Sequence, residues 1–228
     1  IVGYKTVGKV YGCDNHGDII VSGTIKELST KTISQIKIGG IVSYISSGVD
    51  NASASYSSVS DGKIEFSGTA DCELVIGGAV AHSYGTQSTL TSNTKIEISG
   101  TANQGVIVGG AYGWTFYAVN SLTFGGTIDI KESAVIKKHC LVGGCIGGVT
   151  GVSTTVRKVS NLTNNGTLTL NGSFECVLNA SGCVGRAEIE ESKESKAAHT
   201  FTNLVNNGSI TCNGPISGGS ESVTYITG

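Results

Sequence analysis

Alternating apolar and polar residues recur along the chain in short runs. Lys-Ile-Glu-Phe at 63–66, Lys-Ile-Glu-Ile at 95–98 and Thr-Ile-Asp-Ile at 127–130 each place an apolar side chain at every second position. A period of two is typical of a β-strand with one buried face. Glycine, asparagine and serine bound most of these runs, and these residues favour tight turns. The pattern therefore predicts many short strands.

The runs belong to a longer repeat. Residues 62–79 and 94–111 are identical at ten of eighteen positions, and 159–172 and 201–214 agree at eight of fourteen. Self-similarity at a nearly fixed period indicates a repeat architecture. Equivalent units begin at Gly17, Gly62, Thr94, Gly126, Gly166 and Gly208.

One such unit cannot bury its apolar face alone, but units stacked about 4.8 Å apart share a continuous core. The repeat therefore predicts an all-β fold: a parallel β-solenoid, or right-handed β-helix, of about six coils with loop insertions. Residues 1–228 are predicted to form a single solenoid segment. Because the chain opens on Ile1 and contains no methionine, we expect it to be a fragment of a longer repeat protein.

Turn residues recur at matching places in the units. Asp61, Asn93, Asn165 and Asn207 are predicted to lie above one another, where stacked amides can bond along the axis. Glycine pairs at 39–40, 77–78, 109–110 and 143–144 are predicted to mark a corner or a close backbone approach.

Two stretches, 46–60 and 188–199, interrupt the repeat and are predicted to be loops extruded from a coil. Loops inserted in a solenoid often carry partner contacts. Simple solvated excursions are the alternative.

The composition narrows the functional classes. Charged residues make up 14% of the chain and the net charge is −2, with no basic run along the strands. Nucleic acids and anionic membranes are therefore not expected partners. The apolar stretches are too short to insert into a membrane. The seven cysteines are irregularly spaced, and we expect most of them to be unpaired core residues.

The opening of the chain resembles the GLUG motif, a glycine-rich repeat of bacterial surface proteins. The residues that carry the resemblance are Val2-Gly3-Tyr4, Val10, Cys13, Asn15 and Gly17. Later traces at 77–79, 109–111 and 201–204 are similar to repeats of polymorphic outer-membrane autotransporter adhesins. These resemblances imply a secreted or surface-displayed β-solenoid that serves in adhesion or as a spacer. Neither family supplies a catalytic residue to this chain.

Three carboxylates are candidates for chemistry. Glu65, Glu97 and Asp129 occupy the same outward position in three successive units, so they are expected about 4.8 Å apart. Retaining glycosidases hold two carboxyl groups at about 5 Å. However, Lys63 and Lys95 lie two residues before the acids on the same face, which favours a charge-balanced, solvated surface.

Aromatic residues provide a second candidate site. Tyr112, Trp114 and Tyr117 lie close together in the sequence, and aromatic platforms bind sugar rings or proteins. Counting in twos instead places Tyr112, Trp114 and Phe116 on the face that holds Ile76, where they would pack in the core.

The sequence therefore predicts a non-catalytic extracellular or cell-surface module for adhesion, presentation or structural assembly. Its partner is expected to be a protein or glycan surface, with end-to-end self-association of the solenoid. We expect neither a cofactor nor a metal ion. The alternative is a polysaccharide-active β-helix enzyme, a glycoside hydrolase or lyase, that uses Glu65, Glu97 and Asp129.

Overall fold

The computed structural model describes residues 2–5, 10, 12–26, 35–46, 54–85, 87–151, 157–189, 199–218 and 224–228. Within these ranges every regular element is a β-strand, and no helix could cross a membrane. The strands form four sheets, which we number in the order in which one coil visits them.

The first sheet contains β2 (Ile19–Val21), β7 (Lys63–Phe66), β12 (Lys95–Ile98), β17 (Thr127–Ile130), β21 (Thr167–Leu170) and β25 (Ser209–Cys212). The second contains β3 (Thr24–Ile25), β4 (Gln35–Gly39), β8 (Thr69–Ala70), β9 (Glu73–Gly77), β13 (Thr101–Ala102), β14 (Val106–Gly109), β18 (Val135–Gly143), β22 (Ser173–Ser181) and β26 (Tyr225–Thr227).

The third sheet contains β1 (Val2–Lys5), β5 (Val42–Ile45), β10 (Val80–Ser83), β15 (Tyr112–Thr115), β19 (Ile146–Gly151) and β23 (Val184–Ile189). The fourth contains β6 (Ala54–Ser60), β11 (Gln87–Ser92), β16 (Val119–Phe124), β20 (Lys158–Asn164) and β24 (Thr200–Asn206).

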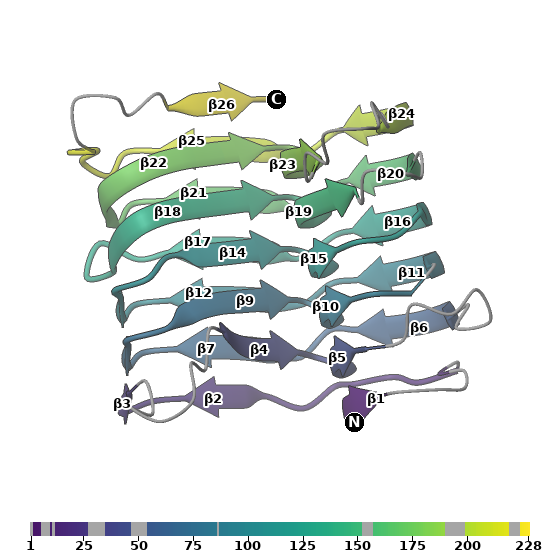
Figure 1. Ribbon diagram of the computed structural model, residues 1–228, viewed down its shortest axis with the longest axis horizontal. Coiled ribbons are helices and arrows are strands. Elements are labelled where there is room, and N and C mark those ends of the chain that lie inside the picture. The colour runs from purple at the N-terminus through teal and green to yellow at the C-terminus, as the bar shows by residue number, and fades with distance from the viewer. Residues whose placement is uncertain are drawn as a thin grey trace.

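The chain winds through these sheets lap after lap as a right-handed parallel β-solenoid of about six coils (Figure 1). Strands of successive coils pair in parallel, and Ile64, Ile96 and Ile128 are direct neighbours in the first sheet. This is the stacking that the repeat predicts. Insertions change the length of a coil, and beside the first insertion the pairing of β11 with β6 shifts in register between Ser88 and Leu90.

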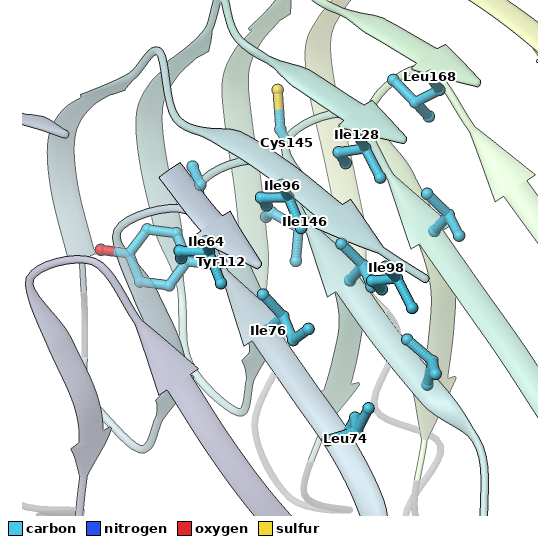
Figure 2. Close-up of a cluster of buried hydrophobic side chains, with 14 of the residues drawn as sticks. Ile64, Leu74, Ile76, Ile96, Ile98, Tyr112, Ile128, Cys145, Ile146 and Leu168 are labelled. Atoms are coloured by element: carbon cyan, nitrogen blue, oxygen red, sulfur yellow. The ribbon is translucent and has the colours of Figure 1, made fainter. Parts of the chain in front are cut away.

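Alternate side chains of the strands fill the interior. Ile64, Ile96, Ile128 and Leu168 form one continuous row whose members are at most 1% exposed (Figure 2). The opposite wall supplies Leu74, Ile76 and their equivalents. Each coil thus contributes apolar area that only its neighbours can cover, so the core depends on stacking.

The glycine pairs form the corner between the second and third sheets, as predicted. A Cβ atom on Gly77, Gly109 or Gly143 would lie 1.9, 1.8 or 1.8 Å from the carbonyl oxygen three residues ahead. No side chain fits in that space, so glycine is required sterically at each of these positions.

Asparagine ladders bond the last two coils along the axis. Asn207 Nδ2 donates to Asn165 Oδ1 at 3.0 Å, which is the ladder predicted for the turns. The ladder does not run through all coils, because Gly125 occupies the equivalent position between Asn93 and Asn165. A further ladder links Asn203 Nδ2 to Asn161 Oδ1 at 2.9 Å.

The prediction that both stretches are extruded loops is partly wrong. Residues 54–60 of the first stretch form β6, which pairs with β11 in the fourth sheet. This segment is rich in serine and does not alternate apolar and polar residues. The hydrophobic pattern of the sequence therefore gave no sign of a strand here. Glu188 of the second stretch belongs to β23. The remainder, 47–53 and 190–198, lies outside the described residues.

Five of the seven cysteines are buried, as expected of core residues: Cys72, Cys140, Cys145, Cys176 and Cys183. Cys140, Cys145, Cys176, Cys183 and Cys212 are free thiols. Burial raises the pKa of Cys176 to about 11 and that of Cys140 well above its ordinary value. The Cys140 and Cys176 thiols are therefore protonated and unreactive at neutral pH.

Candidate binding face

The three predicted aromatic residues lie in different environments. Tyr112 is fully buried in the core, where its ring points into the solenoid (Figure 2). Trp114 is partly exposed and lies outside the core. Tyr117 is partly exposed, and the Arg157 guanidinium lies 4.4 Å from its ring centroid. The structure therefore places Tyr112 away from any surface site.

Counting in twos correctly places Tyr112 in the core but wrongly places Trp114 and Phe116 there. The alternation fails in β15, because Thr115 is fully buried and aligns with the core residue Val149. Two inward positions are thus three residues apart after the glycine corner. Trp114, between them, points outward.

An aromatic ladder follows the outside of the third sheet. Ring centroids lie 5.2 Å apart for Tyr4 and Tyr44, and 4.3 Å apart for Tyr84 and Phe116, whose planes differ by 9°. The His82 ring lies 5.0 Å from Tyr84 and 5.5 Å from Phe116. We define the aromatic ladder as Tyr4, Tyr44, His82, Tyr84, Trp114 and Phe116.

A spacing signal in the sequence could have identified this ladder. Tyr44, His82 and Trp114 each follow the second glycine of a pair by four residues, and Tyr84 and Phe116 follow by six. Parallel in-register stacking turns an equal offset into a row. In the later coils the same offset gives Gly148 and Arg186, so the aromatic part of the row ends at Trp114.

Trp114 fills the angle where the second and third sheets meet outside the core. It packs on Val75, Ile107 and Leu141, which are at most 1% exposed although their side chains leave the outer face of the second sheet. A Cβ on Gly148, in the next coil, would meet the indole at 2.6 Å. The indole therefore leans over Gly148.

The ladder includes one neutral imidazole, His82, and Lys37 lies against it. Lys37 Nζ lies 4.6 Å from the centroid of Tyr44, a cation–π contact. Burial, and then the positive charge of Lys37, lower the pKa of His82 to about 3. His82 is therefore neutral at physiological pH and acts as another flat ring in the stack.

The predicted carboxylates lie in one row, but lysines neutralise them. Glu65, Glu97 and Asp129 are register neighbours in the first sheet. Glu97 Oε1 lies 2.8 Å from Lys95 Nζ and 3.3 Å from Lys131 Nζ, and its Oε2 lies 2.6 Å from Lys63 Nζ. Lys63 also pairs with Glu65, and Lys131 with Asp129.

These ion pairs control the titration of the central acid. Hydrogen bonds from Lys63, Lys95 and Lys131 lower the pKa of Glu97 to about 2. A general acid for glycoside cleavage needs a raised pKa, so that it still carries a proton near neutrality. The arrangement at Glu97 has the opposite effect. Nowhere in the described ranges do three His, Cys, Asp or Glu side chains gather as a metal site would require.

In comparisons with known proteins, no family model, no curated protein and no solved structure matches the chain. The resemblance to GLUG repeats and to autotransporter adhesins therefore stays a prediction. The functional argument rests on the surface itself.

Proposed function

We propose that the chain is a non-catalytic extracellular or cell-surface β-solenoid module that binds a glycan surface through the aromatic ladder. The observation that carries this proposal is the ladder itself, six rings on one outer face. The solenoid keeps these rings in fixed places because each one lies in a strand of the third sheet or directly after one. The module thus presents a rigid, preformed surface.

An extended aromatic surface suits saccharides for a physical reason. Sugar rings have apolar C–H faces that pack on flat π-systems, while their hydroxyl groups stay solvated at the edges. Tyr4 is 63% exposed, and Tyr44 and Trp114 are partly exposed, so part of each ring is accessible. An exposed group of large rings on a small-residue solenoid is typical of an interaction site rather than of packing.

The direct test is glycan binding by ladder variants. Parent chain and variants are screened on an array of neutral and acidic oligosaccharides, and hits are measured by calorimetry. We expect the substitutions Tyr4→Ala and Tyr44→Ala each to weaken binding about tenfold, since each removes one stacking surface.

Phe201→Ala is the matched control for that experiment. It removes an aromatic ring that is 38% exposed, but on the fourth sheet, away from the ladder. This control should bind like the parent. If no glycan binds the parent, or if Phe201→Ala weakens binding as much as the ladder variants do, the proposed function is wrong.

We propose in addition that the isolated 228-residue chain associates end to end with a second copy. The last coil supports this: Phe201 and Leu204 are each 38% exposed, whereas Val159 and Leu162, their partners one coil earlier, are 0% exposed. Strands β24 and β25 also have one edge that no described strand pairs with. The first and second sheets reach both ends of the solenoid, through β2 and β3 at one end and β25 and β26 at the other. The first coil of another copy can therefore continue these two sheets.

Light scattering after gel filtration tests this association. Leu204→Lys places a charge in the apolar end and should yield monomers at concentrations where the parent forms larger species. Glu132→Lys is the control, because it places a lysine at an exposed position of a middle coil, away from both ends. A parent chain that is monomeric at every concentration would contradict the proposal.

A further inference from the structure

Beyond Trp114 the angle between the second and third sheets opens into a cavity. The indole leans over Gly148, and the next residue in the same row is Arg186 of β23. A cavity of about 480 Å³ lies there, lined by Lys138, His139, Val177, Asn179, Arg186 and Tyr225. These residues come from β18, β22, β23 and β26, the strands of the last coils (Figure 1).

The lining combines cations with neutral groups and contains no carboxylate. Lys138 has a left-handed backbone with φ of 67°, and its ammonium group donates to the neutral amide oxygen of Gln104. Within the described residues, no acid neutralises Lys138. This wall of the cavity is therefore positively charged.

Arg186 supplies a cation from the opposite sheet. Glu188 Oε1 lies 2.7 Å from its Nε, and Arg186 forms no other ion pair with a described residue. The two terminal nitrogens of a guanidinium carry N–H groups that match the two oxygens of a carboxylate. Glu188 also restrains the side chain, which lowers the entropy lost on binding.

The other lining groups suit a sugar ring. Tyr225 is 59% exposed and presents an aromatic ring at the rim. The Asn179 amide is partly buried and makes no hydrogen bond to a described residue, so it can donate to and accept from hydroxyl groups. His139 Nε2 is fixed by Glu73 at 2.8 Å, which holds the imidazole at the cavity wall.

We propose that this cavity binds the carboxylate of an acidic saccharide, a uronic acid residue, and that the same glycan continues over the aromatic ladder. Arg186 and Lys138 hold the carboxylate from two sheets, Tyr225 packs on the ring, and Asn179 bonds to its hydroxyl groups. The inference rests on the proposed function and names its ligand class. The solenoid thus distinguishes acidic from neutral chains at one end of the ladder.

The experiment uses the 228-residue chain and two matched probes: tetragalacturonic acid and its fully methyl-esterified form. The ester has the same rings and hydroxyl groups but no carboxylate. At low ionic strength we expect the acid to bind the parent about tenfold more tightly than the ester, in line with a charge-assisted pair. Raising the salt concentration should remove most of the difference.

Three variants locate the difference in the cavity. Arg186→Gln with Glu188→Gln removes the ion pair without leaving a free carboxylate, and should make acid and ester bind equally. Lys138→Asn removes the second cation with a residue that tolerates the left-handed backbone, and should reduce the preference severalfold. Lys26→Gln, which removes an exposed charge in the first coil, should leave the preference unchanged.

The outcomes separate this inference from the proposed function. If acid and ester bind the parent equally, and Tyr44→Ala weakens both, the ladder stands and the carboxylate site is overturned. If the acid preference survives the Arg186 and Lys138 variants, or if a sulfated oligosaccharide binds more tightly than the uronate, the assignment is also overturned. If neither probe nor any other glycan binds, the proposed function fails as well.

Discussion

Gly109→Ala is expected to destabilise the solenoid by more than about 3 kcal/mol, enough to prevent folding in a marginally stable chain. The added methyl group would lie 1.8 Å from the carbonyl oxygen of Tyr112 and 2.5 Å from the amide nitrogen of Gly147. Both contacts are with backbone, which cannot rotate away as a side chain can. The corner would have to open, and the strands on either side would lose register with the next coil.

Urea unfolding followed by far-UV circular dichroism measures this effect. Gly3→Ala is the control, because a Cβ at Gly3 meets nothing within 4 Å. The free energy of unfolding of that variant should stay within about 0.5 kcal/mol of that of the parent. If Gly109→Ala unfolds at the same urea concentration as Gly3→Ala, the corner is not the steric constraint that the backbone contacts indicate.

The repeat made the fold predictable because it encodes register directly. An offset of 32 residues between Ile64 and Ile96 is meaningful only if the two lie in successive coils, and the structure pairs them. The alignment of Glu65 with Glu97 follows from the same offset. Where one alternation is held over several units, position in the unit decides which face a side chain occupies.

The face of Trp114 was not predictable from alternation, because the glycine corner changes the period. Beyond the corner, Tyr112 and Thr115 are both fully buried although three residues separate them, so counting in twos fails after Tyr112. Comparing how many residues each aromatic residue lies after the glycine pair of its own unit would have predicted the row. That comparison needs no assumption about the local backbone. Local periodicity therefore predicts the straight strands, and unit-to-unit alignment predicts the rows beside the corners.

Neither local periodicity nor unit-to-unit alignment predicts the cavity at Arg186. Its walls come from β18, β22, β23 and β26, whose distances in the sequence reflect insertions of different length. No motif connects Lys138 with Arg186 or with Tyr225. Only the stacked coils bring these side chains together, so this site had to be found from the structure.

His82→Phe is expected to remove a pH-dependent loss of stability. His82 is 4% exposed, and neither ring nitrogen has a hydrogen-bond partner among the described residues. Its pKa is lowered to about 3 in the folded chain, from an ordinary value of 6.5. Between these two values the unfolded chain binds a proton at this ring and the folded chain does not. Stability therefore falls as the pH drops from 6.5 towards 3, by up to about 1.4 kcal/mol per pH unit.

Urea unfolding at pH 7 and pH 4.5 tests this expectation. Phenylalanine keeps a flat ring beside Tyr84 and Phe116 but cannot be protonated. At pH 7 the free energy of unfolding of the variant should therefore lie within about 1 kcal/mol of that of the parent. At pH 4.5 it should be more stable than the parent by about 2 kcal/mol. His16→Phe retains His82 and should keep the loss that this ring causes at low pH. Equal pH dependence in the His82→Phe variant and the parent would show that His82 is protonated inside the ladder, and that the stack accommodates a cation.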